Sequence, residues 1–198
     1  MKITQRLDRH SLELVIGVAL LGVGLTVLFP LLGVVGLIPP TDTRAVELDD
    51  RTRAPGGTTG ETSLRGTHDA ELVVSDPALL DRVLLTGPEI IQGILILVVL
   101  TLAMRIATTL RADGAIFVPQ NPRRLYGIAV TLLLTATLVP GLDVVTTMAL
   151  VNGTPLDATV EIAYQLSGTT LLLSFLAAGL AGAFAYGTRL RDDTEGLV

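Results

Sequence analysis

The stretch that decides the fold runs from residue 89 to residue 107 and reads EIIQGILILVVLTLAMRIA. It has an acid at its start and an arginine near its end, and Ile, Leu and Val fill most of the space between them. An α-helix rises about 1.5 Å per residue, so about 20 such residues cross the roughly 30 Å hydrocarbon core of a bilayer. The stretch therefore predicts a transmembrane helix.

Three more stretches of this kind share the chain. The predicted transmembrane helices are 12–38, 88–107, 122–150 and 163–187. Hydrophobic residues make up 49% and charged residues 17% of the chain, a balance too apolar for a soluble domain. The first apolar run is about twice as long as the core of a cleaved signal peptide, so we expect a retained anchor helix. We predict an all-α integral membrane protein with four transmembrane helices.

The charged flanks predict the orientation, because Lys and Arg in short loops favour the cytoplasmic side. Nine basic residues and five acids lie in 1–11, 105–125 and 188–198, giving a net charge of +4. Five arginines and eleven acids lie in 39–87 and 149–162, giving −6. We therefore predict that both termini are cytoplasmic. The predicted cytoplasmic segments are 1–11, 108–121 and 188–198, and the predicted extracytoplasmic segments are 39–87 and 151–162.

The extracytoplasmic segment 39–87 is the largest connection. Its β-rich stretches Arg44–Leu48 and Glu71–Val74 predict a two-stranded hairpin, with a flexible loop, APGGTTG, at 54–60. Asp76, followed by Pro77, predicts the start of a short amphipathic helix that ends before a second helix begins at Pro88. We therefore expect a small, partly β segment, too poor in large apolar residues to form an independent core.

The third and fourth helices carry readable signals. Asn121 is a strong N-cap before Pro122, and Pro140 predicts a kink near the other end of the same helix. In the fourth helix, small residues recur four apart in two adjacent ladders, the pattern of close helix packing. These predicted packing residues are Ser174, Ala178 and Gly182 in one ladder, and Gly179, Ala183 and Gly187 in the other.

Polar residues within the predicted spans are candidates for function, because they are costly in lipid. The candidates are Glu89, Gln92, Asp143 and Gln165. Glu89 and Gln92 share a helix face and could bind a cation or proton; alternatively, Glu89 is a helix-terminal carboxylate that reaches water. The chain has no cysteine, and its histidines, His10 and His68, fall on opposite sides of the predicted membrane. With no catalytic motif in view, we predict no enzyme activity, no cofactor and no metal.

The most specific local pattern is cytoplasmic and reads LRADGAIFVPQNPRRL, residues 110–125. Phe117, Asn121 and the pair Arg124-Leu125 resemble the signature of the YoaS-like group, a bacterial family of four-helix membrane proteins known as a domain of unknown function. The stretch VVSDP at 73–77 and the tail 187–198, rich in arginine and acids, are also similar to that family. Tyr126 departs from it, because the family more often has a basic residue there.

The resemblance implies a bacterial plasma-membrane protein without an established activity. Many members of the family resemble partners of small helix-turn-helix regulators. The leading hypothesis is a regulatory or interaction protein that contacts membrane lipids and a cytosolic transcription regulator, without binding nucleic acid itself; oligomerisation stays open. The candidate interaction residues are Phe117, Asn121, Arg123, Arg124, Leu125, Arg189 and Arg191.

The alternative is a small transporter or channel subunit. It requires a polar stripe along a helix, and the third helix offers a weak one in Thr131, Thr135 and the pair Thr146-Thr147. Threonines in helices more often donate to the backbone of their own helix, which leaves no polar path.

Overall fold

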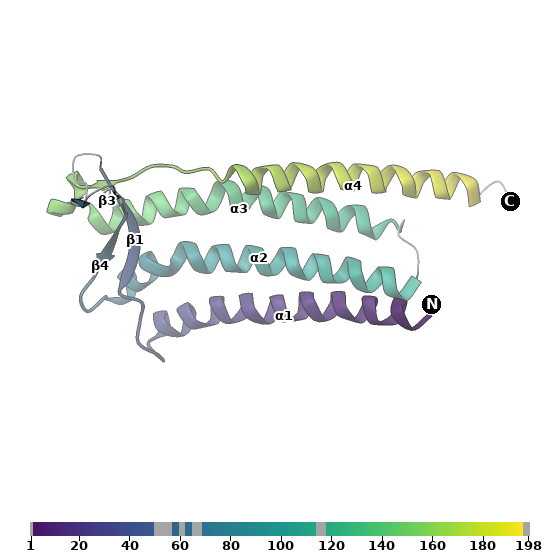
Figure 1. Cartoon of the computed structure of the whole chain (residues 1–198), viewed down its shortest axis with the longest axis horizontal. Coiled ribbons are helices and arrows are strands. Elements are labelled where there is room, and N and C mark those ends of the chain that lie inside the picture. Colours follow the sequence, from purple (N-terminus) through teal and green to yellow (C-terminus); the bar gives the residue numbers. More distant parts are fainter. Residues whose placement is uncertain (1, 50–56, 60–61, 65–68, 114–117, 196–198) are drawn as a thin grey trace. The chain divides into compact units, whose positions relative to one another are not determined.

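The computed structural model describes residues 2–49, 57–59, 62–64, 69–113 and 118–195. Its main elements are four long helices: α1 (Lys2–Val35), α2 (Leu79–Asp113), α3 (Gln120–Val151) and α4 (Gly168–Glu195) (Figure 1). Each contains a segment long and apolar enough to cross a membrane, which confirms the prediction of four such helices.

Large apolar side chains are exposed along all four helices. Val18, Val98, Val130 and Leu172, one from each helix, are examples. Water solvates so much apolar surface poorly, and monomeric soluble proteins rarely expose large contiguous patches of it. This exposure is what a lipid-embedded chain requires.

The chain divides into two compact units. The bundle unit comprises Met1–Leu28, Ile90–Val139 and Leu166–Val198, and the sheet unit comprises Phe29–Glu89 and Pro140–Gln165. Three helices pass from one unit to the other, and each carries a proline within two residues of the boundary: Pro30, Pro88 and Pro140. Proline removes a helical N–H donor, so each helix loses one backbone hydrogen bond close to that boundary.

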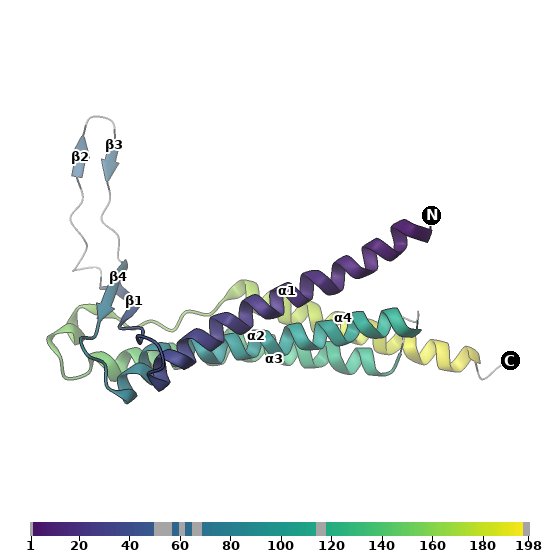
Figure 2. The same cartoon turned by 90° about the horizontal axis from the view of Figure 1, so that it is seen from below.

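Close contacts in the bundle unit occur at small residues. A Cβ added to Gly93 of α2 would lie 2.3 Å from Cγ2 of Val27 in α1, so only glycine fits there. At Gly127 of α3 a Cβ would lie 3.1 Å from Cδ1 of Leu102 in α2. Neighbouring helices in this unit run in alternating directions, so the start of α1 and the end of α4 lie at the same end (Figures 1 and 2).

Helix α1 begins at Lys2, so the predicted tail 1–11 is helical from its second residue. The helix ends in a Schellman motif: Gly36 has a φ of 84°, its N–H donates to the carbonyl of Gly33, and the N–H of Leu37 donates to that of Leu32. Gly36 therefore stops the helix at Val35, three residues earlier than predicted.

Helix α2 corrects two predictions. A short helix was expected to start after Asp76 and a separate one at Pro88, but a single helix runs through Pro88 from Leu79 to Asp113. Asp76 has a positive φ of 52°, and the carboxylate of Asp81 instead accepts from the N–H of Ala78, 3.0 Å away. Glu89 therefore lies inside a helix and not at a helix N-terminus.

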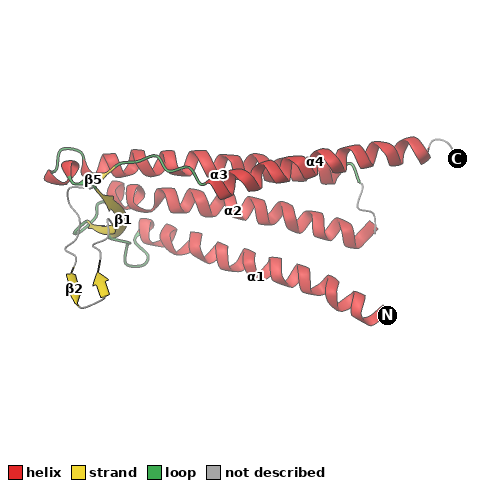
Figure 3. Cartoon of the chain, turned by 45° about the horizontal axis from the view of Figure 1, so that its top comes forward, coloured by secondary structure: helices red, strands yellow, loops and turns green. Residues whose placement is uncertain are grey.

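The sheet unit holds a three-stranded antiparallel sheet of order β4-β1-β5 (Figure 3). Strand β1 (Thr43–Leu48) pairs with β4 (Asp69–Val73), as expected for 44–48 and 71–74. The third strand, β5 (Val160–Glu161), was not predicted. Strands β2 (Gly57–Thr59) and β3 (Thr62–Leu64) pair with each other in a separate two-stranded sheet.

The two faces of the three-stranded sheet differ in chemistry. The buried face packs Leu72 and Val160 against Val151, near the end of α3. The exposed face carries acids in register, because Glu47 on the central strand lies opposite Asp69 on one side and Glu161 on the other. Like charges directly opposite one another destabilise a sheet, so repulsion among these three carboxylates disfavours the pairing on this face.

Helices α3 and α4 also begin and end differently from the prediction. Helix α3 starts at Gln120, which places Asn121 and Pro122 inside its first turn. Helix α4 starts at Gly168 instead of residue 163, because the preceding residues leave β5 as extended chain. Ser167 caps it by accepting from the N–H of Thr170, 3.3 Å away, and the helix continues to Glu195 through most of the predicted tail.

Candidate functional site

The most elaborate polar cluster in the sheet unit forms around Arg44. Alternation along β1 turns Ala45 and Glu47 outward and Arg44 and Val46 toward the protein. Arg44 is only 9% exposed, an unusual position for a guanidinium group. A buried charge of this kind requires several hydrogen-bond partners, or it would destabilise the fold.

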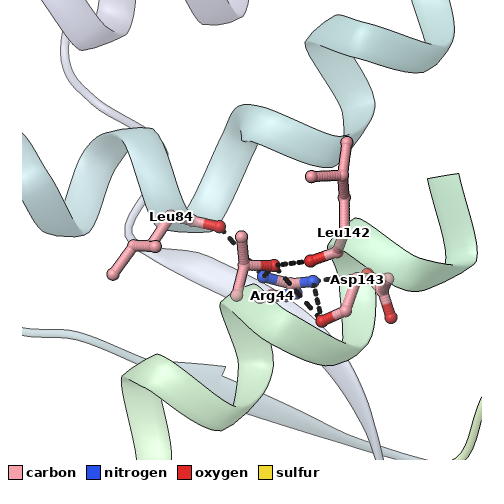
Figure 4. Close-up of polar contacts among 5 residues, drawn as sticks. Arg44, Leu84, Leu142 and Asp143 are labelled. Carbon is pink, nitrogen blue, oxygen red and sulfur yellow. Dashed lines mark hydrogen bonds and ion pairs between the residues drawn. The ribbon is translucent and has the colours of Figure 1, made fainter. Parts of the chain in front are cut away.

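Two helices supply those partners (Figure 4). From α2, the carbonyl of Leu84 accepts from Nη1 of Arg44 at 2.9 Å. From α3, Oγ1 of Thr146 accepts from the same nitrogen at 2.8 Å, and the carbonyl of Asp143 accepts from Nη2 at 3.1 Å. Nη2 also forms an ion pair with the carboxylate of Asp143.

The two charged groups of this cluster are paired with each other but differ in burial. The Asp143 side chain is 59% exposed, whereas Arg44 is enclosed by its protein partners. Thr146 accepts from Arg44 and donates its own hydrogen to the carbonyl of Leu142, 2.7 Å away. The Nη–H donors of Arg44 and the hydroxyl of Thr146 are thus occupied by protein acceptors. The cluster is therefore suited to holding β1, α2 and α3 together rather than to chemistry on a substrate.

The four polar candidates from the predicted spans have separate surroundings. Asp143 binds Arg44, and Gln165 donates to the carboxylate of Glu47 at 2.7 Å from the extended segment before α4. Glu89 and Gln92 are exposed on α2, and neither forms a hydrogen bond with the residues that the structure describes. Among those residues, no group of three His, Cys, Asp or Glu side chains has a geometry that could hold a metal ion.

A second arginine cluster lies in the bundle unit, where α3 begins. Nη1 of Arg124 donates to the carbonyl of Arg105 at 2.7 Å, to Oγ1 of Thr109, and to Oδ1 of Asn121 at 3.3 Å. Nη2 donates to Oε1 of Gln120 at 3.2 Å. Asn121 itself is 0% exposed. Its side chain thus accepts from Arg124, three residues further along α3, and Asn121 lies inside the helix instead of at the predicted N-cap.

The candidate interaction residues divide by exposure. Arg123, Arg189 and Arg191 are exposed, Arg124 and Leu125 are half-buried, and Asn121 is buried and cannot present a surface to a partner. Phe117 lies outside the described residues.

The two small-residue ladders of α4 have different environments. In the first, Ser174 is buried and Ala178 and Gly182 are half-buried. In the second, Gly179 and Ala183 are exposed and Gly187 is half-buried. Ala181, which belongs to neither ladder, is fully buried.

Three of the four candidate threonines of α3 bond to their own helix and do not form a polar path. Thr131, Thr135 and Thr146 each donate from Oγ1 to the carbonyl four residues earlier, at 2.7–2.9 Å. Their hydroxyl hydrogens therefore bond to the helix itself and not to a passing solute.

Sequence reasoning missed the role of Arg44. Its signal was a lone arginine at an inward position of an alternating strand. Its acceptors lie far along the sequence, at Asp143 and at the carbonyl of Leu84, which Pro88 leaves without its helical donor. No protein-family model, curated protein or solved structure matches the chain.

Proposed function

We propose that this chain is a non-enzymatic, multi-pass protein of the bacterial plasma membrane that binds a cytosolic protein partner. The bundle-unit end that carries the start of α1 and the end of α4 faces the cytoplasm, because the flanks there have a net charge of +4. The acid-rich sheet unit faces the exterior. The resemblance to the YoaS-like group makes a helix-turn-helix regulator the candidate partner.

The exposed arginines near the cytoplasmic helix ends carry this proposal. Arg123 on α3 and Arg189 on α4 are exposed, and neither forms an ion pair with a carboxylate of the described residues. Arg44, in contrast, is enclosed by its own partners. Exposed guanidinium groups without internal partners suit an acidic protein surface, because charge complementarity speeds association and excludes wrong partners.

A small transporter or channel subunit has less support. The α3 threonines donate to their own helix, and the polar residues Asp143 and Gln165 bond within the sheet unit.

Site-specific photo-crosslinking in living cells tests the proposal. A photoreactive residue at position 123 or 189 should capture the same cytosolic protein, and one at the exposed apolar Leu133 should not. With the photoreactive residue at one of these positions, charge reversal at the other (R189E or R123E) should abolish the capture with normal expression. If position 123 and position 189 capture no common protein, or if capture survives charge reversal, the proposal is wrong.

A further inference from the structure

We propose that Arg105 and Arg124 form a binding site for the phosphate of an anionic phospholipid headgroup, where α2 approaches its end and α3 begins. This site adjoins Arg123, one of the protein-binding arginines proposed above, and it needs no cytosolic partner. Four observations support it: how Arg124 is held, which of its donors remain, what lies beside it, and which surface adjoins it.

Among the residues that the structure describes, only neutral groups hold Arg124 in place. Its four acceptors are the carbonyl of Arg105, the hydroxyl of Thr109 and the amide oxygens of Asn121 and Gln120. These bonds fix the guanidinium group, but none of them neutralises its charge. A half-buried charge without a counter-ion is unfavourable, so an anion that reaches it gains binding free energy.

The same bonds leave part of the guanidinium group available. Arginine has five N–H donors. Nη1 serves three acceptors and Nη2 serves one, and no described residue accepts from Nε. Nε–H and one Nη2–H thus remain, and these two donors can bind phosphate oxygens.

Two more arginines raise the positive charge at this point. Arg105 is exposed, and its carbonyl accepts from Arg124, which brings the two residues together across α2 and α3. Arg123 is exposed next to Arg124 in the chain. No carboxylate of the described residues forms an ion pair with Arg105, Arg123 or Arg124.

The adjoining surface is apolar, which favours a lipid over a free phosphate ion. Val98 precedes Arg105 by seven residues and Val130 follows Arg123 by seven, about two helical turns, so each arginine shares a helix face with an exposed valine. Acyl chains can cover these valines while the headgroup phosphate binds the arginines. Basic pockets between transmembrane helices on the cytoplasmic side bind anionic lipid headgroups in this manner.

Lipid titration of the purified full-length protein tests the site. In a neutral detergent, delipidated protein is titrated with phosphatidylglycerol or with phosphatidylcholine, and bound lipid is counted by native mass spectrometry. We expect phosphatidylglycerol to bind at least about ten-fold more tightly. R105Q should weaken its binding about five-fold. R124K keeps the positive charge but loses the planar array of guanidinium N–H donors, and should weaken phosphatidylglycerol binding as well. The control R82Q removes an arginine of the sheet unit and should change nothing.

Several results would overturn the proposal. Equal binding of the two lipids would remove the preference for an anionic headgroup. Unchanged affinity in both R105Q and R124K would place the lipid elsewhere. Displacement of phosphatidylglycerol by an equal concentration of inorganic phosphate would identify a free anion as the ligand. If R124K does not fold, R105Q decides, because that side chain is exposed and its loss leaves the hydrogen bonds of Arg124 intact.

Discussion

Arg44 donates a hydrogen bond to the carbonyl of Leu84, the one carbonyl of α2 whose helical donor is removed by Pro88. In an α-helix the N–H of residue 88 would bond to that oxygen, and proline has no N–H. A side chain from β1 therefore replaces a backbone donor for a carbonyl forty residues away. Because the same guanidinium group also binds Asp143, the proline break in α2 is coupled to the sheet and to α3.

We predict that Arg44→Met destabilises the sheet unit by about 2–4 kcal/mol, because it leaves the carbonyl of Leu84 without a donor and Asp143 without its ion-pair partner. Hydrogen exchange of the β1 amides in detergent measures this local stability. Arg82→Met is the control, because the Arg82 side chain donates one hydrogen bond among the described residues, to the carbonyl of Pro77, and its loss should cost less. Equal protection of the β1 amides in Arg44→Met and in the native chain would show that Arg44 does not stabilise the sheet unit.

Pro88→Ala should reduce the cost of losing Arg44. Alanine restores the N–H that bonds to the carbonyl of Leu84, so that carbonyl no longer depends on the arginine. In a double-mutant cycle, Arg44→Met should cost about 1 kcal/mol less in the Pro88→Ala background than in the native one. Strictly additive effects would show that the two residues are independent.

Gly93→Ala should destabilise the bundle unit by about 1–3 kcal/mol, because the new methyl group would overlap Cγ2 of Val27. Adding Val27→Ala makes room and should recover most of the loss. Gly22→Ala in α1 is the matched control, since nothing lies within 4 Å of its added Cβ. Thermal unfolding in detergent compares the four proteins, and a Gly93→Ala protein as stable as the Gly22→Ala control would refute the contact.

Glu161→Gln should stabilise the three-stranded sheet by about 0.2–1 kcal/mol, because it removes one of the two acids that face Glu47. The control is Glu71→Gln, an exposed change on the same sheet whose cross-strand partner is Ala45. Hydrogen exchange of β1 at low ionic strength provides the comparison. The difference between the two variants should shrink as salt is added; a gain at Glu71 as large as at Glu161 would argue against in-register repulsion.

The sequence predicted those parts of the fold that depend on local patterns. Hydropathy identified four long helices, and alternation identified the segments that pair as β1 and β4. Prediction from the sequence failed where a residue distant along the chain decides where a helix begins or which strands pair. Pro88 was taken as a helix start, yet α2 runs through it, with Arg44 supplying the missing donor. Strand β5 has only two residues, too few to show a period, and its pairing with β1 delays the start of α4.

For the polar sites too, the sequence indicated the local residues but not their distant partners. Asp143 and Arg124 could be chosen from the sequence, since a charge near an apolar span is conspicuous. Their partners could not: Asp143 binds an arginine ninety-nine residues earlier, and Arg124 reaches a carbonyl of the preceding helix. Backbone carbonyls leave no trace in a sequence. Coordinates are therefore needed to find the Arg44 cluster, which uses the carbonyls of Leu84 and Leu142, and the Arg124 cluster, which uses that of Arg105.

The orientation in the membrane is the central claim, and labelling of single cysteines tests it most directly. The chain has no cysteine, so a cysteine introduced at the exposed position Asp157 or Asp193 is the only thiol present. In intact cells, a membrane-impermeant maleimide should label Asp157→Cys, in the connection between α3 and α4, and should label Asp193→Cys near the end of α4 only after permeabilisation. Labelling of Asp193→Cys in intact cells, with Asp157→Cys protected, would contradict the account.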